Sequence, residues 1–194
     1  MKSEEIKDAA LKYFTLHGYE GASLSLIAED VGMKKQSIYA HFKGKDDLFL
    51  QVLRDAKETE LSSKLQYFSS IGSQHPEKAL YGFLQLVIDL FQKDERLTFW
   101  LRMSFFPPAH LAKAIEQEVI DIEEKVQAML ERKFQDWIDE KAIVEEAAKT
   151  PTLAFLGVVD SIMLELVYGG NDEQRLKDKL EASWTVFWRG IAHP

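Results

Sequence analysis

The stretch AALKYFTLHGYEGASLSLIAEDVGMKKQSIYAHFKGKDDLF, residues 9–49, decides the fold of the first part of this 194-residue chain. Apolar residues recur in it three and four positions apart, and Gly18, Gly32 and Gly44 separate the recurring groups. The pattern predicts three short helices, followed by a fourth that begins at Lys45. The second and third, joined through Gly32 and Met33, form the outline of a helix-turn-helix.

The third short helix has two different faces. Ile38 and Phe42 lie four residues apart and form its buried side. Its other positions carry hydrogen-bond donors, acceptors and an aromatic ring: Lys35, Gln36, Ser37, Tyr39, Ala40 and His41. An ordinary solvated helix carries a mixture of Glu and Lys, whereas a recognition helix must offer such groups to the major groove. This face is therefore a candidate for contact with DNA.

Charge supports that interpretation only when it is counted locally. The chain has a net charge of −8, which by itself argues against binding to nucleic acid. Residues 32–45, however, contain four lysines and no acidic residue. Lys45 stands at a helix start, where its charge adds to free backbone N–H groups and favours a phosphate. A plain solvated basic edge is the alternative for these lysines.

Several short motifs occur together, in register, over about 40 residues of the quoted stretch. They are Gly18-Tyr19, Ile27-Ala28 before Val31-Gly32, Ile38-Tyr39 before His41-Phe42, and then Lys45 and Leu48. This combination resembles the N-terminal domain of the tetracycline-repressor (TetR) family of bacterial transcription regulators. The resemblance implies a homodimer that binds a short palindromic operator in double-stranded DNA, and represses until a ligand in the C-terminal domain releases it.

The resemblance also assigns roles to residues in the first part of the chain. Positions on the second helix, on the recognition helix and at the following helix start imply this set of DNA-binding residues: Ser23, Ser25, Lys34, Lys35, Gln36, Ser37, Tyr39, His41 and Lys45. Two positions depart from the family pattern. Ala22 stands where a threonine is common, and Lys34 stands where a serine usually caps the recognition helix, a loss of about 1 kcal/mol.

The remainder of the chain shows helical periodicity and no useful β alternation. The predicted fold class is therefore all-α, with a helix-turn-helix DNA-binding domain over residues 1–47 and a helical effector-binding and dimerisation domain over residues 48–194. In the second domain, residues 152–168 are apolar nearly all round, so burial on more than one side is expected.

Aromatic and methionine side chains gather where a ligand cavity is expected. Such side chains line adaptable cavities, although plain core packing is the alternative for each of them. The predicted ligand-binding residues are Phe83, Phe99, Trp100, Met103, Phe106, Met129, Phe155, Val159 and Met163. The expected ligand is a small apolar or aromatic molecule of unknown identity.

Two apolar helices near the end of the chain suggest a partner. Two antiparallel helices from each of two chains would form a four-helix interface of the kind that the family uses, with burial inside one chain as the alternative. The predicted dimer-interface residues are Leu156, Leu166, Leu180, Trp184, Phe187 and Trp188.

Other classes of protein lack support in the sequence. Without cysteine there is no disulfide framework and no thiolate zinc site, and no catalytic or metal-binding motif is visible. We therefore expect no enzyme, no cofactor and no metal. Without an apolar N-terminal segment or a run of about 18 apolar residues, we expect a cytoplasmic protein with no membrane partner. A helical protein-interaction module or a ligand carrier without DNA binding is the alternative function.

Overall fold

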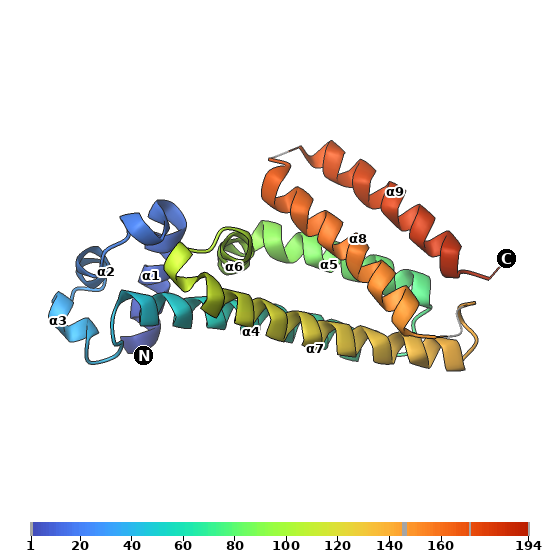
Figure 1. Ribbon diagram of the computed structural model, residues 1–194, viewed down its shortest axis with the longest axis horizontal. Helices are drawn as coiled ribbons and strands as arrows, with labels where there is room; N and C mark the ends of the chain where they lie inside the picture. Colours follow the sequence, from blue (N-terminus) through green and yellow to red (C-terminus); the bar gives the residue numbers. More distant parts are fainter. Residues whose placement is uncertain (1, 145–146, 171, 194) are drawn as a thin grey trace. The chain divides into compact units, whose positions relative to one another are not determined.

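The computed structural model describes residues 2–144, 147–170 and 172–193. All regular elements among these residues are helices, which confirms the predicted all-α class. They are α1 (Lys2–Gly21), α2 (Leu24–Asp30), α3 (Lys35–Ile38), α4 (Lys45–Ser70), α5 (Pro76–Lys93), α6 (Glu95–Phe105), the 3-10 helix η1 (Ala109–Leu111), α7 (Ala112–Asp139), α8 (Lys149–Tyr168) and α9 (Glu173–Ile191) (Figure 1).

The helices form two compact units. The head unit holds the chain up to Glu60 together with Asp94–Val119, and the body unit holds Leu61–Lys93 together with the residues from Ile120 onward. This division differs from the predicted boundary after residue 47, because α6 and η1 join the helix-turn-helix segment in one unit. Which residues serve DNA contact and which serve effector binding and dimerisation stays a prediction.

Aromatic rings form the core of the head unit. Phe14 of α1 meets Phe49 of α4 edge to face, with ring centroids 4.9 Å apart. Phe49 in turn meets Phe99 of α6 at 5.5 Å. Phe14, Phe49 and Phe99 are 1%, 0% and 2% exposed, so each ring gives nearly its whole apolar surface to the core. This packing fixes α6 to α1 and α4 within the head unit.

Local sequence signals set the ends of the first two helices. Gly18 has φ 67° and ψ 179°, so the regular part of α1 stops there, as predicted. The Ser23 hydroxyl accepts a hydrogen bond from the Leu26 N–H at 3.2 Å and caps α2. At the other end of α2, Gly32 adopts φ 65°, and the Met33 N–H donates to the Ala28 carbonyl at 2.8 Å.

The recognition helix α3 is shorter than the sequence predicts. Lys34 occupies its N-cap position and provides no side-chain hydrogen bond, in agreement with the missing cap noted in the sequence. The regular helix ends at Ile38, whose carbonyl accepts from the N–H groups of both His41 and Phe42, at 2.9 and 3.0 Å. Residues 39–41 therefore form a turn that keeps single helix-type hydrogen bonds but does not extend the regular helix.

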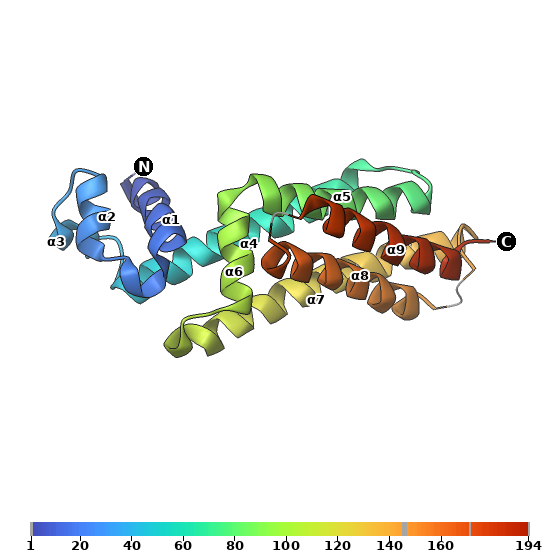
Figure 2. The same cartoon turned by 90° about the horizontal axis from the view of Figure 1, so that it is seen from above.

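Phe155 of α8 is the centre of the body unit. Its ring lies 6.0 Å from Phe83 of α5, 6.2 Å from Phe134 of α7 and 5.3 Å from Phe187 of α9, and its side chain is fully buried. Helices α8 and α9 lie side by side in both views (Figure 2). The body unit is thus a helical bundle in which α8 packs against α5 on one side and α9 on another.

By length and composition alone, α8 is apolar enough to cross a membrane, contrary to what the sequence suggested. The two results differ because they use different criteria. Lys149–Tyr168 has no continuous run of about 18 apolar residues, but its mean hydropathy is high and it contains few charges. Phe155, Val159 and Ile162 of this helix are at most 3% exposed in the bundle. Core helices of this kind meet the same compositional criterion, so the property is weak evidence for a membrane.

Candidate nucleic-acid interface and ligand pocket

Helices α2 and α3 hold the candidate interface through their apolar sides. Ile27 and Ala28 of α2 and Ile38 of α3 are at most 1% exposed, and so is Phe42 in the turn that follows. Because both helices bury one side in the head unit, the opposite side of α3 must face outward. The predicted buried face of the recognition helix is therefore present as expected.

The structure places the nine predicted DNA-binding residues in the head unit, mostly at its surface. Six are exposed: Ser25, Lys34, Lys35, Gln36, Tyr39 and His41. Three are partly covered: Ser23, Ser37 and Lys45. Tyr39 is 53% exposed, more than a tyrosine that serves the core would be. Donor and acceptor groups at these exposed positions are free to meet base edges or phosphates.

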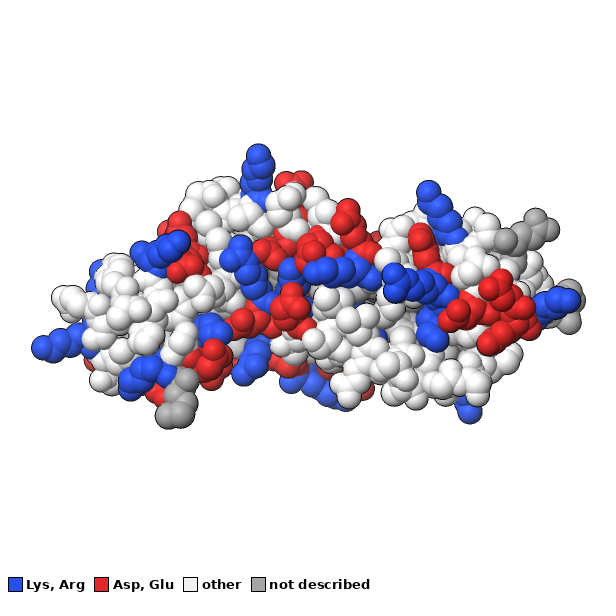
Figure 3. Space-filling model, turned by 90° about the horizontal axis from the view of Figure 1, so that it is seen from below, with Lys and Arg blue, Asp and Glu red and all other residues white. Residues whose placement is uncertain are grey.

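The charge around α3 suits a polyanion. In Figure 3 the surface around α3 is mainly basic and uncharged, whereas acidic and basic side chains are interspersed on other parts of the same face. This agrees with the four lysines and the absence of acids in residues 32–45. A local positive potential of this kind attracts DNA even though the whole chain is acidic.

Lys45 is held in place by neighbours that come from the end of α1. Its Nζ lies 4.2 Å from the centroid of the Tyr19 ring, an arrangement that attracts a cation to the π face. The same Nζ donates a hydrogen bond of 3.5 Å to the Glu20 carbonyl. These contacts limit the positions that the ammonium group takes before any phosphate binds.

A second layer holds Tyr19 itself. The Tyr19 hydroxyl donates a hydrogen bond to Asp46 Oδ1, and His110 Nε2 lies 3.5 Å from the same oxygen. The ring centroids of Tyr19 and His110 are 4.9 Å apart. The hydrogen bond from Tyr19, and then the one from His110, lower the pKa of the Asp46 carboxyl. Sequence reasoning missed these roles for Asp46 and His110, since η1 follows in sequence more than 60 residues after α4 begins.

The loop before α4 is fixed by a carboxylate. Asp47 Oδ2 accepts a hydrogen bond from the Lys43 N–H at 2.7 Å, and Oδ1 accepts from Gln51 at 3.0 Å. The hydrogen bond from Gln51, and then that from the Lys43 backbone, lower the pKa of Asp47. A negatively charged residue in the first turn also suits the positive end of α4.

The nine predicted ligand-binding residues fall in both units. Phe99 and Trp100 are buried in the head unit, where Met103 is partly covered and Phe106 is 52% exposed. In the body unit, Phe83, Phe155 and Val159 are at most 3% exposed. Met129 and Met163 of that unit are partly covered. Contact of any of these nine with a ligand stays a prediction.

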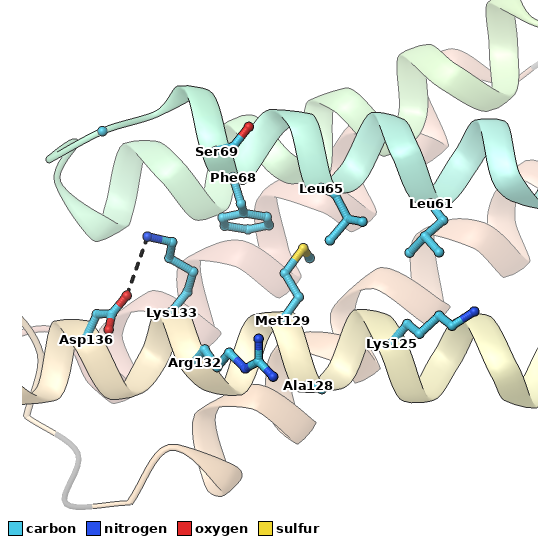
Figure 4. A pocket seen from close by; sticks show the side chains of 11 residues that line it. Leu61, Leu65, Phe68, Ser69, Lys125, Ala128, Met129, Arg132, Lys133 and Asp136 are labelled. Carbon is cyan, nitrogen blue, oxygen red and sulfur yellow. Dashed lines mark ion pairs between the residues drawn. The ribbon is translucent and has the colours of Figure 1, made fainter.

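The body unit contains a pocket of about 760 Å³ between the second half of α4 and α7 (Figure 4). Met129 is the predicted ligand-binding residue that lines it. The remaining lining residues come from the two helices and the turn after α4: Leu61, Leu65, Phe68, Ser69, Gly72, Lys125, Ala128, Arg132, Lys133 and Asp136. Sequence reasoning missed them because the pattern of a single long helix does not show where a cavity forms between it and another helix.

Half of the six predicted dimer-interface residues are buried within the chain itself. Leu180, Trp184 and Phe187 are 6%, 8% and 9% exposed, while Leu156, Leu166 and Trp188 are partly covered. Other apolar side chains of α8 and α9 reach solvent: Leu153, Leu164, Tyr168 and Val186 are 47%, 43%, 61% and 74% exposed. The two helices therefore present an apolar surface that their own unit does not cover.

Glu165 is the charged residue that α8 buries. Its Oε1 lies 2.7 Å from Arg175 Nε, and its Oε2 lies 3.2 Å from Lys179 Nζ, both on α9. Its side chain is 4% exposed. The carboxylate thus joins α8 to α9 within one chain.

Comparison with known proteins agrees with the geometry of the head unit. The family model of bacterial regulatory proteins of the tetR family matches residues 6–52. The chain is 40% identical over 55 residues to the HTH-type transcriptional repressor AcnR of Corynebacterium diphtheriae, a match that spans 28% of this chain and 29% of AcnR. It is 27% identical over 146 residues to the HTH-type transcriptional regulator YhgD of Bacillus subtilis, covering 71% of this chain and 70% of YhgD.

The likeness in three dimensions extends over nearly the whole chain. The crystal structure of the transcriptional regulator FadR from Bacillus subtilis in complex with stearoyl-CoA superimposes with a TM-score of 0.73 at 18% identity, covering 97% of this chain and 98% of FadR. Residues 6–52 thus match the family model of tetR-type bacterial regulatory proteins, and the whole chain shares the fold of the FadR structure. The helix-turn-helix lies within the residues that match the family model, and the helices after it form the rest of the shared fold.

Proposed function

We propose that this protein is a sequence-specific DNA-binding transcriptional regulator, a repressor that a small molecule releases from its operator. The observation that carries the proposal is the pair of faces at the recognition helix. Ile38 and Phe42 are buried, while Lys35, Gln36 and Tyr39 are exposed in a stretch that has no acidic residue. A helix with this division can enter the major groove without disturbing its own core.

A homodimer is part of the proposal. The recognition helices of two subunits would meet successive major grooves about 34–36 Å apart, which matches a palindromic operator. The exposed apolar residues of α8 and α9, among them Leu164 and Val186, support an interface through these helices. Leu156, Leu166 and Trp188, which are partly covered within the chain, would contribute at its edges.

Release by a ligand completes the mechanism. DNA binding requires one separation of the two recognition helices, and a ligand that favours another separation weakens it by its differential affinity for the two states. The FadR structure contains stearoyl-CoA, which supports a helical domain that accepts a small molecule in this fold. Neither a catalytic reaction nor a cofactor enters this function, and its natural place is the cytoplasm, where the operator is.

Two other functions would use the same fold. A ligand carrier would need the body unit alone, and a protein-interaction module would use the helix-turn-helix surface to bind protein. Both would lack a steep fall in DNA affinity with rising salt, because that fall comes from counterions released by phosphate contacts.

The test is fluorescence anisotropy of the purified protein with labelled DNA from directly upstream of its own gene, at two salt concentrations. In vitro selection from random duplexes supplies an operator if that DNA lacks one. We expect tight, salt-sensitive binding that unlabelled nonspecific DNA does not compete away. Failure of both the upstream DNA and the selection to yield a specific site would contradict the proposal.

A further inference from the structure

The pocket of the body unit has an apolar floor. Leu61, Leu65 and Phe68 point from α4 toward α7, and Met129 points from α7 toward α4 (Figure 4). Leu61 and Phe68 are 6% and 4% exposed, whereas Leu65 is 45% exposed. A leucine left this open within a hollow gains free energy when an apolar group covers it.

Three cations of α7 lie beside this floor. Lys125, Arg132 and Lys133 line the pocket against a single acidic lining residue, Asp136, in a chain whose net charge is −8. Two of these cations have a carboxylate beside them: Lys125 Nζ lies 2.8 Å from Asp121, and Lys133 Nζ lies 3.5 Å from Asp136. Arg132 is exposed, and among the described residues no carboxylate pairs with it. Its planar guanidinium is suited to a carboxylate or a phosphate.

We propose that this pocket binds a small amphipathic anion, an acyl chain that ends in a carboxylate or carries a phosphate group. The chain covers Leu65 and the floor beside it, and the anionic group lies at Arg132. The volume of about 760 Å³ is in the range of ordinary ligand sites. The proposal names the ligand class of the regulator proposed above and rests on that function for its effect on DNA.

The positive charge that α7 places beside the pocket disfavours cationic and neutral ligands. A cationic amphiphile would meet the positive charge of Arg132, which no carboxylate offsets among the described residues, and this repulsion costs binding free energy. A neutral apolar molecule would cover the apolar floor but would gain no electrostatic attraction from the cations of α7. An anion gains from both, so affinity should follow the charge of the head group when the chain is kept constant.

The chain connects this pocket to the DNA interface through one helix. Helix α4 begins with Lys45, which belongs to the DNA-binding set, and its residues 61–69 contribute to the pocket. A ligand that binds better to one arrangement of α4 and α7 shifts the population toward it. DNA affinity should therefore change with occupancy of this pocket.

The experiment is isothermal titration calorimetry of the full-length protein with four molecules that share a twelve-carbon chain, below their micelle concentrations. Dodecanoate and dodecyl phosphate are anionic, dodecanol is neutral and dodecyltrimethylammonium is cationic. We expect at least one anion to bind about tenfold more tightly than dodecanol, which corresponds to about 1.4 kcal/mol. The tighter anion identifies the head group, and dodecanoyl-coenzyme A tests whether a phosphate-bearing thioester replaces the free acid.

Variants locate the site. Arg132→Glu should weaken binding of the anion about tenfold or more, and Leu65→Asn, which adds no charge, should weaken all four ligands. The matched control is Lys78→Glu, which reverses an exposed cation of the same unit that does not line the pocket. Circular dichroism shows whether each variant is folded, and Arg132→Gln repeats the test with a smaller change. Equal binding of dodecanol, tighter binding of the ammonium compound, or unchanged binding by both Arg132 variants overturns the proposal.

The same protein preparation separates this inference from the proposed function. Anisotropy with the selected operator is measured with and without the anion, on wild type and on Arg132→Glu. Specific DNA binding without any binding of the anions overturns the ligand class and leaves the regulator in place. Binding of an anion by a protein that recognises no DNA supports the pocket and overturns the regulator.

Discussion

The head unit and the body unit both bury aromatic residues, but they differ in how the sequence marks their candidate functional residues. In the head unit a short motif separates Ile38 and Phe42, which are buried, from Lys35 and Tyr39, which are exposed. In the body unit the pocket lies on the faces of two long helices that show nothing unusual. A candidate site on one short helix can thus be recognised from local sequence. A candidate site formed between two helices cannot, because the sequence does not show which helices pack together.

The predicted ligand-binding residues illustrate the same difference, because several of them also pack in the cores of the two units. Phe99 packs against Phe14 and Phe49 in the head unit, while Phe83 packs against Phe155 in the body unit. Large apolar side chains suit a core and a ligand cavity for the same reason, since both remove apolar surface from water. Residue type alone therefore could not distinguish them.

The largest effect is expected where the head unit depends on α6. Phe49→Ala removes a fully buried ring that meets Phe14, Tyr19 and Phe99. We expect a loss of about 3–5 kcal/mol in the free energy of unfolding, measured by urea denaturation. Phe106→Ala, at a position 52% exposed, should cost less than about 0.5 kcal/mol. Equal losses would contradict the division between core and surface in this unit.

The next effect concerns DNA affinity. Lys45→Ala and Tyr39→Ala should each weaken operator binding about tenfold without changing the dimer, measured by anisotropy and analytical ultracentrifugation. Lys45→Ala should also make the salt dependence shallower, by about 0.9 in the slope for each phosphate that is no longer neutralised, one phosphate per subunit. Lys78→Ala, in the body unit, is the control. A variant with unchanged affinity removes its residue from the interface.

A smaller effect tests whether the layer behind Lys45 positions it. Tyr19→Phe keeps the ring beside Lys45 and removes the hydroxyl that donates to Asp46, and His110→Gln removes the ring that packs on Tyr19. We expect each to lower DNA affinity about two- to fivefold, an effect of about 0.5–1 kcal/mol. His17→Gln controls for removal of a histidine from the head unit. If Lys45→Ala abolishes the effect of Tyr19→Phe, the two act together, whereas additive effects would exclude positioning of Lys45.

The last effect, on stability as a function of pH, has opposite signs in the two units. In the head unit, burial opposes ionisation of Glu118, but hydrogen bonds from Lys57 and Arg54, at 2.6 Å each, hold its pKa below the usual value. Its contribution to stability is therefore present above about pH 4.5 and disappears as the pH falls through the lowered value. Glu118→Gln should cost about 1 kcal/mol at pH 7 and less in acid.

In the body unit, desolvation and then the charge of Asp160 raise the pKa of Glu123, with Lys64 acting against them. A raised pKa means that the protonated carboxyl suits the folded state better, so this contribution is present in acid and disappears as the pH rises through the raised value. Glu123→Gln should therefore be neutral or slightly stabilising at pH 7. Urea denaturation of both variants at pH 4 and pH 7 measures the contrast, and a destabilised Glu123→Gln at pH 7 would contradict it.

Residues 9–49 by themselves determined the all-helical start of the chain, the caps and stops at Ser23, Gly18 and Gly32, and the two faces of the recognition helix. These features depend on contacts between residues a few positions apart, which periodicity and capping rules describe well. The exact length of α3 was less predictable, because the regular helix ends at Ile38, before the stop signal at Gly44.

Only the tertiary structure decided which distant segments share a site. It brought His110 of η1 to Asp46 and Tyr19, assigned Phe99 to the core of the head unit, and formed the pocket from α4 and α7. Each of these contacts joins residues more than 40 positions apart, and the pairing depends on how whole helices pack. Helical periodicity shows which face of a helix is buried, but it does not show which other helix will cover that face.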